Sequence, residues 1–285
     1  MEYIYKQYEV ETQKKLNEKK VVTISDLHLN ENITKYELDD LIIKINDLLP
    51  EYIFILGDVT SYNHLQNKNF QKNLLYFLKV LASLAKTYMV FGNHDYLIDS
   101  KNKLFFTNLN NLLEFYDKSN VKVIHDYAIE DDDMNIVGFD KLPIYYDLEM
   151  KDISKLKEQL LYLLTKIKSI LENQKYTILL THSHLDFLKL EKDILQAFDL
   201  ILAGHTHNGL VPNNLERFFR KNQGFVAHKK FFPDNIRGMI KVSNTPPIIV
   251  NGGITKIGES HSQVIKTLTK PLFKGEIDYI KIKGC

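Results

Sequence analysis

The chain has 285 residues, a length that favours one large α/β domain, and we expect residues 1–285 to form a single domain. With 44% hydrophobic and 26% charged residues, it has the composition of an ordinary soluble globular protein. The formal net charge of +1 argues against a general attraction to nucleic acid or anionic membrane, and the one cysteine, Cys285, excludes an internal disulfide.

The first twenty residues lack the apolar core of a signal peptide. No run of the sequence approaches the roughly eighteen apolar residues of a membrane-spanning helix. We therefore expect a cytoplasmic protein without a transmembrane segment. The oligomeric state has no signature in the sequence.

Strand-like and helical segments alternate in the first third of the chain. Short apolar runs at 21–25, 52–56 and 87–91 have the composition of buried strands. Between them, 36–49 and 70–85 carry leucine and isoleucine at helical spacing, and the first of these stripes is closed by a proline. The order β-α-β-α-β predicts a largely parallel start to a sheet.

The remaining two thirds continue the α/β pattern. A helix is expected at 153–171, where apolar residues recur at helical spacing with charged residues between them. No internal repeat or linker interrupts the chain. Further strands are expected at 121–129, 134–139, 176–180, 199–203, 246–254 and 276–282.

Five of the predicted strands end in short polar motifs. Since the carboxyl ends of neighbouring parallel strands share one edge of a sheet, these motifs are expected to meet there and to hold metal. In chain order the motifs are Asp26-Leu27-His28, Gly57-Asp58, Gly92-Asn93-His94-Asp95, Thr181-His182 and Gly204-His205-Thr206-His207.

The donor atoms of these motifs narrow the kind of metal. Oxygen and imidazole nitrogen without sulfur suit Mn, Fe, Zn or Co, and suit Ca or Mg less well. Seven donors are too many for one tetrahedral ion but suit two ions that share a carboxylate. Spacing alone does not assign the ligands. The candidate ligands are Asp26, His28, Asp58, Asn93, His182, His205 and His207.

The five motifs in this order resemble those of the calcineurin-like metallophosphoesterase superfamily, and the resemblance spans residues 26–207. It implies a four-layer α-β-β-α sandwich, in which two mixed β-sheets pack together and helices cover the outside. It also implies that Asp26, His28 and His207 hold one ion, that Asn93, His182 and His205 hold the other, and that Asp58 bridges both.

The same resemblance implies a dinuclear phosphohydrolase that acts on a phosphorylated small molecule. Two cations would generate a hydroxide that attacks the phosphorus of a phosphomonoester or phosphodiester. His94 resembles the histidine that protonates or stabilises the leaving group, and Asp95 is expected to orient the His94 ring. The metal core does not distinguish monoester, diester and pyrophosphate substrates.

Particular residues bear on the class of this chain within the superfamily. Phe91 stands where protein serine/threonine phosphatases carry a phosphate-binding arginine, which argues against that class. A repair nuclease is disfavoured because little chain follows His207 to build a DNA-binding cap. Asn208-Gly209 after the last motif is similar to bacterial-type members. A non-catalytic scaffold is the alternative from a different class, although no expected ligand is missing.

The segment 216–241 combines seven lysines and arginines with two acidic residues and five phenylalanines. We expect a solvated loop that packs its aromatic rings on the core. The alternative is a wall that attracts an anionic substrate. His184 has three alternative roles: it faces the substrate pocket, supports the metal ligands, or makes a local hydrogen bond at the surface. The histidines expected to be structural are His64, His125, His228 and His261.

Overall fold

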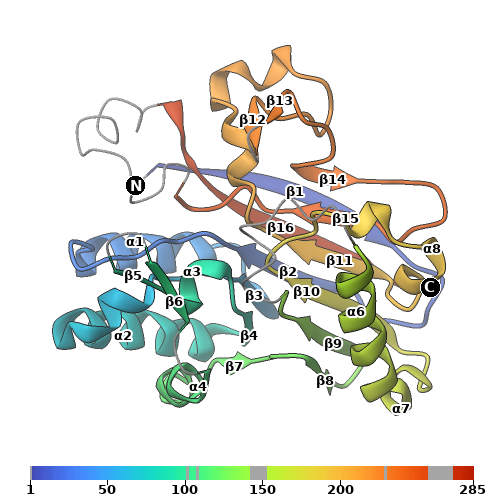
Figure 1. Ribbon diagram of the computed structural model, residues 1–285, viewed down its shortest axis with the longest axis horizontal. Coiled ribbons are helices and arrows are strands. Elements are labelled where there is room, and N and C mark those ends of the chain that lie inside the picture. Colours follow the sequence, from blue (N-terminus) through green and yellow to red (C-terminus); the bar gives the residue numbers. More distant parts are fainter. Residues whose placement is uncertain (1, 101–102, 107–108, 142–152, 228–229, 256–271) are drawn as a thin grey trace.

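Two six-stranded mixed β-sheets pack together at the centre of the structure, and helices lie on both outer sides (Figure 1). The structure is a computed structural model and describes residues 2–285 apart from 101–102, 107–108, 142–152, 228–229 and 256–271. The expected assignments of His228, Lys229 and His261 fall outside these described residues.

The first sheet contains the predicted β-α-β-α-β unit. Strands β2, β3, β4 and β7 run parallel, and β16 joins them by pairing antiparallel with β2 and parallel with β1. In sheet order the strands are β1 (Tyr3–Glu11), β16 (Gly275–Lys283), β2 (Lys19–Ile24), β3 (Tyr52–Leu56), β4 (Lys86–Val90) and β7 (Lys122–Val123). Its helices are α1 (Lys35–Asn46), α2 (Lys68–Leu84) and α4 (Leu109–Asp117).

The second sheet is parallel in its middle and antiparallel at both edges. Its strands in order are β14 (Gly238–Ile240), β15 (Ile248–Val250), β11 (Leu200–Ala203), β10 (Tyr176–Thr181), β9 (Met134–Phe139) and β8 (Tyr127–Glu130). Its helices are α6 (Ser154–Lys166), α7 (Lys168–Leu171) and α8 (Lys192–Leu195).

Short elements connect these layers. They are the helical turn α3 (Asn93–Tyr96), the hairpins β5 (Leu97–Ser100) with β6 (Lys103–Phe106) and β12 (Val226–Ala227) with β13 (Lys230–Phe231), and the 3₁₀ turns η1 (Tyr62–Gln66), η2 (Phe187–Lys189), η3 (His207–Leu210) and η4 (Asn213–Phe218).

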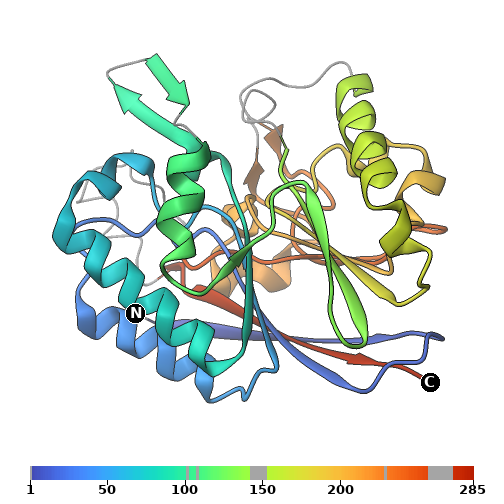
Figure 2. The same ribbon diagram turned by 90° about the horizontal axis from the view of Figure 1, so that it is seen from below.

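Side-chain alternation along the central strands confirms the four-layer sandwich. In β3, Ile53 and Ile55 pack with the helices of the first sheet, whereas Phe54 and Leu56 pack against the second sheet. In β10, Ile178 faces the first sheet, and Leu179 on the opposite face packs under α6 and α8. Strands buried on both faces therefore produce three apolar interfaces between four layers. Figure 2 shows the sheets and the helices outside them from below.

Three sequence expectations about element boundaries were wrong. The predicted helix 36–49 ends at Asn46, and Leu49, with φ 48°, is 71% exposed, so it does not extend the apolar stripe. The predicted strand 121–129 divides at Asp126, whose φ of 52° turns the chain from β7 in one sheet to β8 in the other. The predicted helix 153–171 breaks at Ile167 into α6 and α7.

Within the described residues, no helix combines the length and the apolar character needed to cross a membrane.

Candidate metal centre

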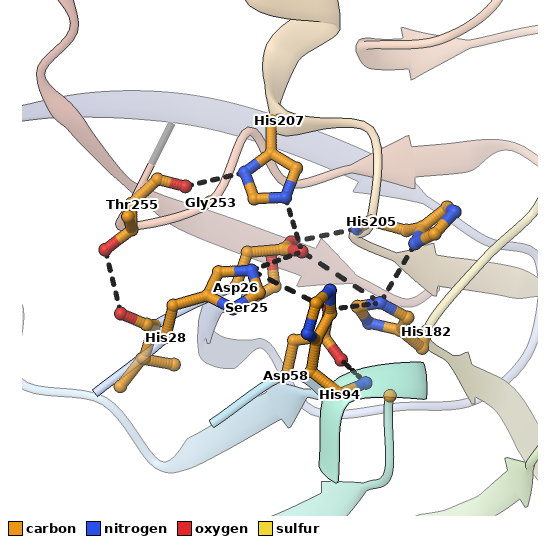
Figure 3. A network of polar contacts seen from close by, with 12 residues as sticks. Ser25, Asp26, His28, Asp58, His94, His182, His205, His207, Gly253 and Thr255 are labelled. Atoms are coloured by element: carbon orange, nitrogen blue, oxygen red, sulfur yellow. Dashed lines mark hydrogen bonds and ion pairs between the residues drawn. The ribbon is translucent and has the colours of Figure 1, made fainter. Parts of the chain in front are cut away.

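The polar motifs follow the carboxyl ends of β2, β3, β4, β10 and β11 and meet between the two sheets (Figure 3). Parallel pairing within each sheet brings these strand ends to the same side. Five of the expected ligands have positive φ, a conformation that is uncommon for residues other than glycine. These are Asp26 (49°), His28 (45°), Asp58 (53°), His205 (75°) and His207 (48°).

Asp58 lies among imidazoles that come from both sheets. Its Oδ2 is 3.2 Å from His182 Nε2 and 3.7 Å from His28 Nε2. His205 Nδ1 in turn lies 3.1 Å from His182 Nε2. Ligand atoms of Asp58, His182 and His205 all lie within 4.8 Å of one another, as metal ligands do around one ion.

Asp26 forms a second such group with His28 and His207. Its Oδ1 lies 3.4 Å from His207 Nε2 and 4.0 Å from His28 Nε2. The other oxygen, Oδ2, accepts a hydrogen bond from the backbone N–H of His205 at 2.8 Å. One carboxylate oxygen is therefore held by the protein while the other faces the imidazoles.

The ionisation of the cluster follows from its burial and its charges. Burial lowers the pKa of His28 to about 4, which leaves the ring neutral. Burial also opposes a charge on His182, but Asp58 and Asp26 outweigh it and raise the pKa of His182 to about 10. Although burial disfavours the Asp58 carboxylate, His182 and His94 hold its pKa well below the usual range. The negative carboxylates thus stabilise a positive charge beside them, although the site is buried.

Unpartnered buried atoms show that a metal fits these residues. Asp26 Oδ1, His28 Nε2 and Asn93 Oδ1 are buried and make no hydrogen bond. Such atoms are costly unless they are paired or coordinate a cation. All three belong to side chains expected as ligands from the motifs, and their donor types match transition-metal coordination.

Backbone carbonyls fix two of the imidazoles in orientations suited to ligation. His182 Nδ1 lies 2.7 Å from the carbonyl oxygen of Leu56, and His207 Nδ1 lies 2.6 Å from that of Thr255. In each ring the hydrogen bond occupies Nδ1, and Nε2 faces the carboxylates. This arrangement is common for metal-ligating histidines because the outer hydrogen bond fixes the ring and its tautomer.

Two glycines allow the loops to approach this closely. A Cβ on Gly57, whose φ is 84°, would lie 2.6 Å from the backbone N of Gly92 and 2.7 Å from His182 Nδ1. A Cβ on Gly92 would lie 2.2 Å from Asp58 Oδ1. Space therefore requires both glycines, and the backbone conformation of Gly57 requires glycine there as well.

His94 is exposed above the cluster, whereas Asp95 is buried beneath it. The His94 ring meets the His28 ring edge-on with centroids 4.8 Å apart, and its backbone N–H donates to Asp58 Oδ1 at 2.8 Å. An exposed imidazole beside the cluster can reach a substrate that occupies the site.

The structure differs from the expectation that Asp95 orients the His94 ring. The two residues are adjacent in α3, and adjacent residues of a helical turn do not face each other. Asp95 instead accepts backbone N–H bonds from four residues of two loops, and burial and the Asp58 charge raise its pKa to about 7. The donors are Asp58 (2.8 Å), Val59 (3.1 Å), Thr60 (3.3 Å) and Gly92 (2.8 Å).

The loop after β15 also supports the site, although sequence reasoning did not include it. Ser25 Oγ lies 2.6 Å from Asp26 Oδ2 and 2.9 Å from Asn251 Oδ1, and a Cβ on Gly253 would lie 2.9 Å from Asp26 Cβ. Thr255 supplies the carbonyl that orients His207. The available signal was a strand run closed by Asn-Gly-Gly, the same pattern that marks the five motifs.

Other residues considered from the sequence have structural contacts. His184 is 2% exposed, and its Nε2 lies 2.7 Å from the carbonyl oxygen of Asn235, so its hydrogen bond is internal. Phe91 is buried against Tyr96 and Tyr116, where it cannot contact a substrate phosphate. His125 hydrogen-bonds to Asp140, consistent with a structural role.

The expectation that the aromatic rings of 216–241 pack on the core was wrong. Phe218 is 70% exposed and Phe231 is 73% exposed, and neither belongs to the buried clusters of the two sheets.

The sequence is similar to those of known metallophosphoesterases. The model of the calcineurin-like phosphoesterase family matches residues 19–209. An uncharacterized metallophosphoesterase of Campylobacter jejuni is 30% identical over 193 residues, which cover 67% of this chain and 45% of that protein. One from Aquifex aeolicus is 24% identical over 253 residues, which cover 87% of this chain and 82% of that protein.

A transmembrane protein with a metallophosphoesterase domain from Bos taurus is 26% identical over 251 residues, which cover 85% of this chain and 50% of that protein. The chain thus spans about half the length of the Campylobacter and bovine relatives. Among solved structures, a dimetal phosphatase from Danio rerio has 13% identity and a TM-score of 0.47, with 82% of this chain and 87% of that chain covered. The match of one family model to most of the chain, together with the Campylobacter relative, shows that the chain belongs to the calcineurin-like phosphoesterase family.

Proposed function

We propose that the chain is a dinuclear metal-dependent phosphohydrolase that cleaves a phosphomonoester or phosphodiester of modest size. Family membership supports the coarser description, a metal-dependent phosphoesterase. The observation that carries the finer proposal is the convergence of candidate ligands at the ends of strands from both sheets, where Asp26, His28 and Asn93 have buried donor atoms without hydrogen-bond partners. Mn, Fe, Zn and Co are the candidate ions.

The ligand assignment has a distinct basis for each ion. The group formed by Asp26, His28 and His207 supports the first site, and the group formed by Asp58, His182 and His205 supports the second. Asn93 joins the second site through its unpartnered Oδ1. Asp58 is the shared ligand because its Oδ2 lies near imidazoles of both groups, those of His28 and His182.

When bound, two cations would lower the pKa of a water and neutralise charge on the phosphoryl oxygens. The chain contributes the orientation of the donors and the exclusion of water from beneath them, because Asp26, Asp58 and His182 are at most 1% exposed. In this proposal His94 gives a proton to the leaving-group oxygen, and its exposure beside His28 supports that role. Asp95 acts as a positioning residue by holding the backbone of the Asp58 loop.

The proposed substrate is a phosphorylated small molecule. Since Phe91 is buried and offers no positive charge, the substrate phosphate depends on the cations and His94 for recognition. The balanced net charge argues against tight duplex binding, so a nucleic acid is not the proposed substrate. A cytoplasmic location remains a prediction, to be checked by cell fractionation.

The proposal is tested by removing metal from the protein and reloading it with Mn, Fe, Zn or Co. Activity is then measured on generic monoesters and diesters, on pyrophosphate compounds and nucleotides, and on phospholipid head groups. We expect at least one metal to restore hydrolysis of a phosphoester. His94→Ala should retain metal and lose roughly 10²–10⁴-fold in turnover, whereas the control His64→Ala should keep both metal and turnover.

Two results would replace the proposal. Metal binding without hydrolysis of any phosphoester would favour the protein-interaction scaffold. Salt-sensitive binding and degradation of DNA would favour the nuclease. Full turnover in metal-loaded His94→Ala would remove the role given to that residue.

A further inference from the structure

A lobe follows η3, the turn that begins with the expected ligand His207, and its described residues are 211–227 and 230–237. It contains η4 and the hairpin of β12 and β13, and it stands above the sheets in Figure 1. The lobe concentrates large apolar side chains in solvent, which is unusual for a folded surface and marks interaction sites. These are Leu215 (41% exposed), Phe218 (70%), Phe225 (42%), Phe231 (73%) and Phe232 (53%).

Four of the aromatic side chains, those of Phe219, Phe225, Phe231 and Phe232, form one group of contacting rings. The Phe225 ring centroid lies 6.3 Å from that of Phe231 and 5.7 Å from that of Phe232, with edge-to-face geometry. Phe219 extends the group, with its ring centroid 6.2 Å from that of Phe232. These contacts hold the rings together at the surface of the lobe, so little order has to be gained when the group meets an apolar partner.

The same lobe carries positive charges without acidic partners. Arg217 lies over the Phe218 ring at 4.8 Å, and Lys221 and Lys230 are exposed. Among the described residues, none of these three cations forms an ion pair with a carboxylate. Arg220 and Arg237 differ, because they pair with Asp234 (3.2 Å) and Glu216 (3.6 Å). The excess charge is therefore local, although the whole chain is nearly neutral.

The base of the lobe is fixed to the loops of the metal centre. Ile236 is 3% exposed and fills the space beside Gly209 and Gly224, where any Cβ would lie less than 3 Å from its side chain. Its carbonyl oxygen accepts a hydrogen bond from Thr206 Oγ1 at 2.5 Å. The next carbonyl back along the chain is held by His184. The exposed rings therefore keep a fixed position relative to the site.

We propose that the lobe docks on the surface of an anionic lipid bilayer. The phenylalanines would enter the boundary between head groups and acyl chains, and Arg217, Lys221 and Lys230 would contact lipid phosphates. A second copy of the chain is a poorer partner, because a self-complementary contact would bring like charges together. Nucleic acid is also poorer, since three unpaired cations are few for phosphate binding and the rings cover one another edge-on.

Vesicle co-sedimentation of the full chain tests this docking without any catalytic readout. Vesicles of phosphatidylcholine alone are compared with vesicles that also contain phosphatidylglycerol, at low and at high salt. We expect binding to the anionic vesicles, weak binding to the neutral ones, and loss of affinity as salt rises.

Two matched pairs of variants separate the contributions of rings and charges. Phe218→Ser with Phe231→Ser should weaken binding roughly tenfold per ring, whereas Tyr36→Ser with Tyr162→Ser removes rings that are 79% and 70% exposed elsewhere and should have no effect. Charge reversal at Arg217, Lys221 and Lys230 should weaken binding about fivefold or more per site. The same net change made at Lys72, Lys118 and Lys155, exposed lysines on α2, after α4 and on α6, should weaken binding much less.

The proposal is overturned if anionic vesicles are not bound, if the control variants lose as much affinity as the lobe variants, or if the ring variant binds like wild type. It is also overturned if the lobe binds nucleic acid but not vesicles, or if its substitutions abolish self-association in light scattering while vesicle binding is absent. Thermal unfolding of each variant verifies that it is folded, as expected for substitutions at exposed positions.

Discussion

The metal centre and the lobe that follows it show opposite uses of side-chain burial. At the centre, Asp26, Asp58 and His182 are charged or polar groups with at most 1% exposure. In the lobe, Phe218 and Phe231 are apolar groups with at least 70% exposure. Either arrangement costs free energy in the isolated chain, and each becomes favourable when a partner of matching chemistry is present, a cation in one case and an apolar surface in the other.

Close glycine contacts hold both regions in place. Gly57 and Gly92 meet beneath the ligands, and Gly209 and Gly224 meet beside Ile236 at the base of the lobe. These contacts connect the metal centre rigidly to the exposed apolar surface of the lobe. Substitutions at the centre should impair metal binding and turnover, whereas substitutions in the lobe should impair vesicle binding.

The largest effect is expected at the shared ligand. Asp58→Ala removes the carboxylate that lies near imidazoles of both groups, so both ions should bind poorly and turnover should fall by about 10³-fold or more. Metal analysis after gel filtration and steady-state kinetics measure the two losses. Vesicle binding by the same variant should be unchanged, and a parallel loss of vesicle binding would show that the two regions are not separable.

The free energy of unfolding should be sensitive to substitution of Gly57, which makes a close backbone contact beneath the ligands. Gly57→Ala combines a φ of 84° with Cβ distances below 3 Å, so we expect the free energy of unfolding to fall by about 3 kcal/mol or more, with weakened metal binding. Gly238→Ala is the control, because its φ of 64° is similar but its nearest neighbour would be 3.5 Å away. It should cost only about 1 kcal/mol. Equal losses in denaturant unfolding would contradict the steric explanation.

The base of the lobe should tolerate change less well than its surface. Ile236→Ala removes a side chain that is 3% exposed, and the free energy of unfolding should fall by about 2–4 kcal/mol. Hydrogen exchange should then rise across the lobe before it rises in the two sheets. Phe231→Ala, at a position 73% exposed, should change the free energy of unfolding by less than about 0.5 kcal/mol. A large loss at Phe231 would mean that its ring supports the fold.

A small pH dependence is expected outside both regions, at His125. Burial opposes its charge, but the hydrogen bond to Asp140 and the charges of Asp140 and Asp126 together outweigh burial and raise the pKa of His125. Stabilisation by this pair is then complete below the ordinary histidine pKa of about 6.5 and is lost as pH rises through the elevated value. Measured without metal, the free energy of unfolding of the wild type should exceed that of His125→Gln by less than about 1 kcal/mol at acidic pH. At alkaline pH the two should show no such gain for the wild type. A gain that grows with pH would refute the pairing.

The sequence predicts the centre better than the lobe for a physical reason. Each ligand follows a buried strand within a few residues, and parallel pairing brings such strand ends together without long-range information. Strands β3 and β10, which are buried on both faces, could likewise be predicted from short apolar runs in the sequence. The exposure of the rings in 216–241 depends instead on how the base of the lobe packs, where Ile236 contacts Gly209 and Gly224, and no periodicity of the sequence marks that contact.

The supporting roles of Asp95 and of the Asn251 loop could not be predicted from the sequence for one physical reason, since both depend on tertiary contacts between loops. The bonds of Asp95 to the Asp58 loop depend on how two loops meet, so adjacency to His94 was a poor guide. The Asn251 loop reaches Ser25 across more than two hundred residues of sequence, and only the neighbouring positions of the strand ends disclose it.

Metal stoichiometry together with electron paramagnetic resonance of the Mn²⁺-loaded chain tests the central claim most directly. If the strand-end loops form one shared dinuclear site, wild type should bind two ions per chain with an exchange-coupled spectrum, and Asp58→Ala should lose that coupling. A single bound ion, or two ions with the spectrum of isolated Mn²⁺, would contradict the account.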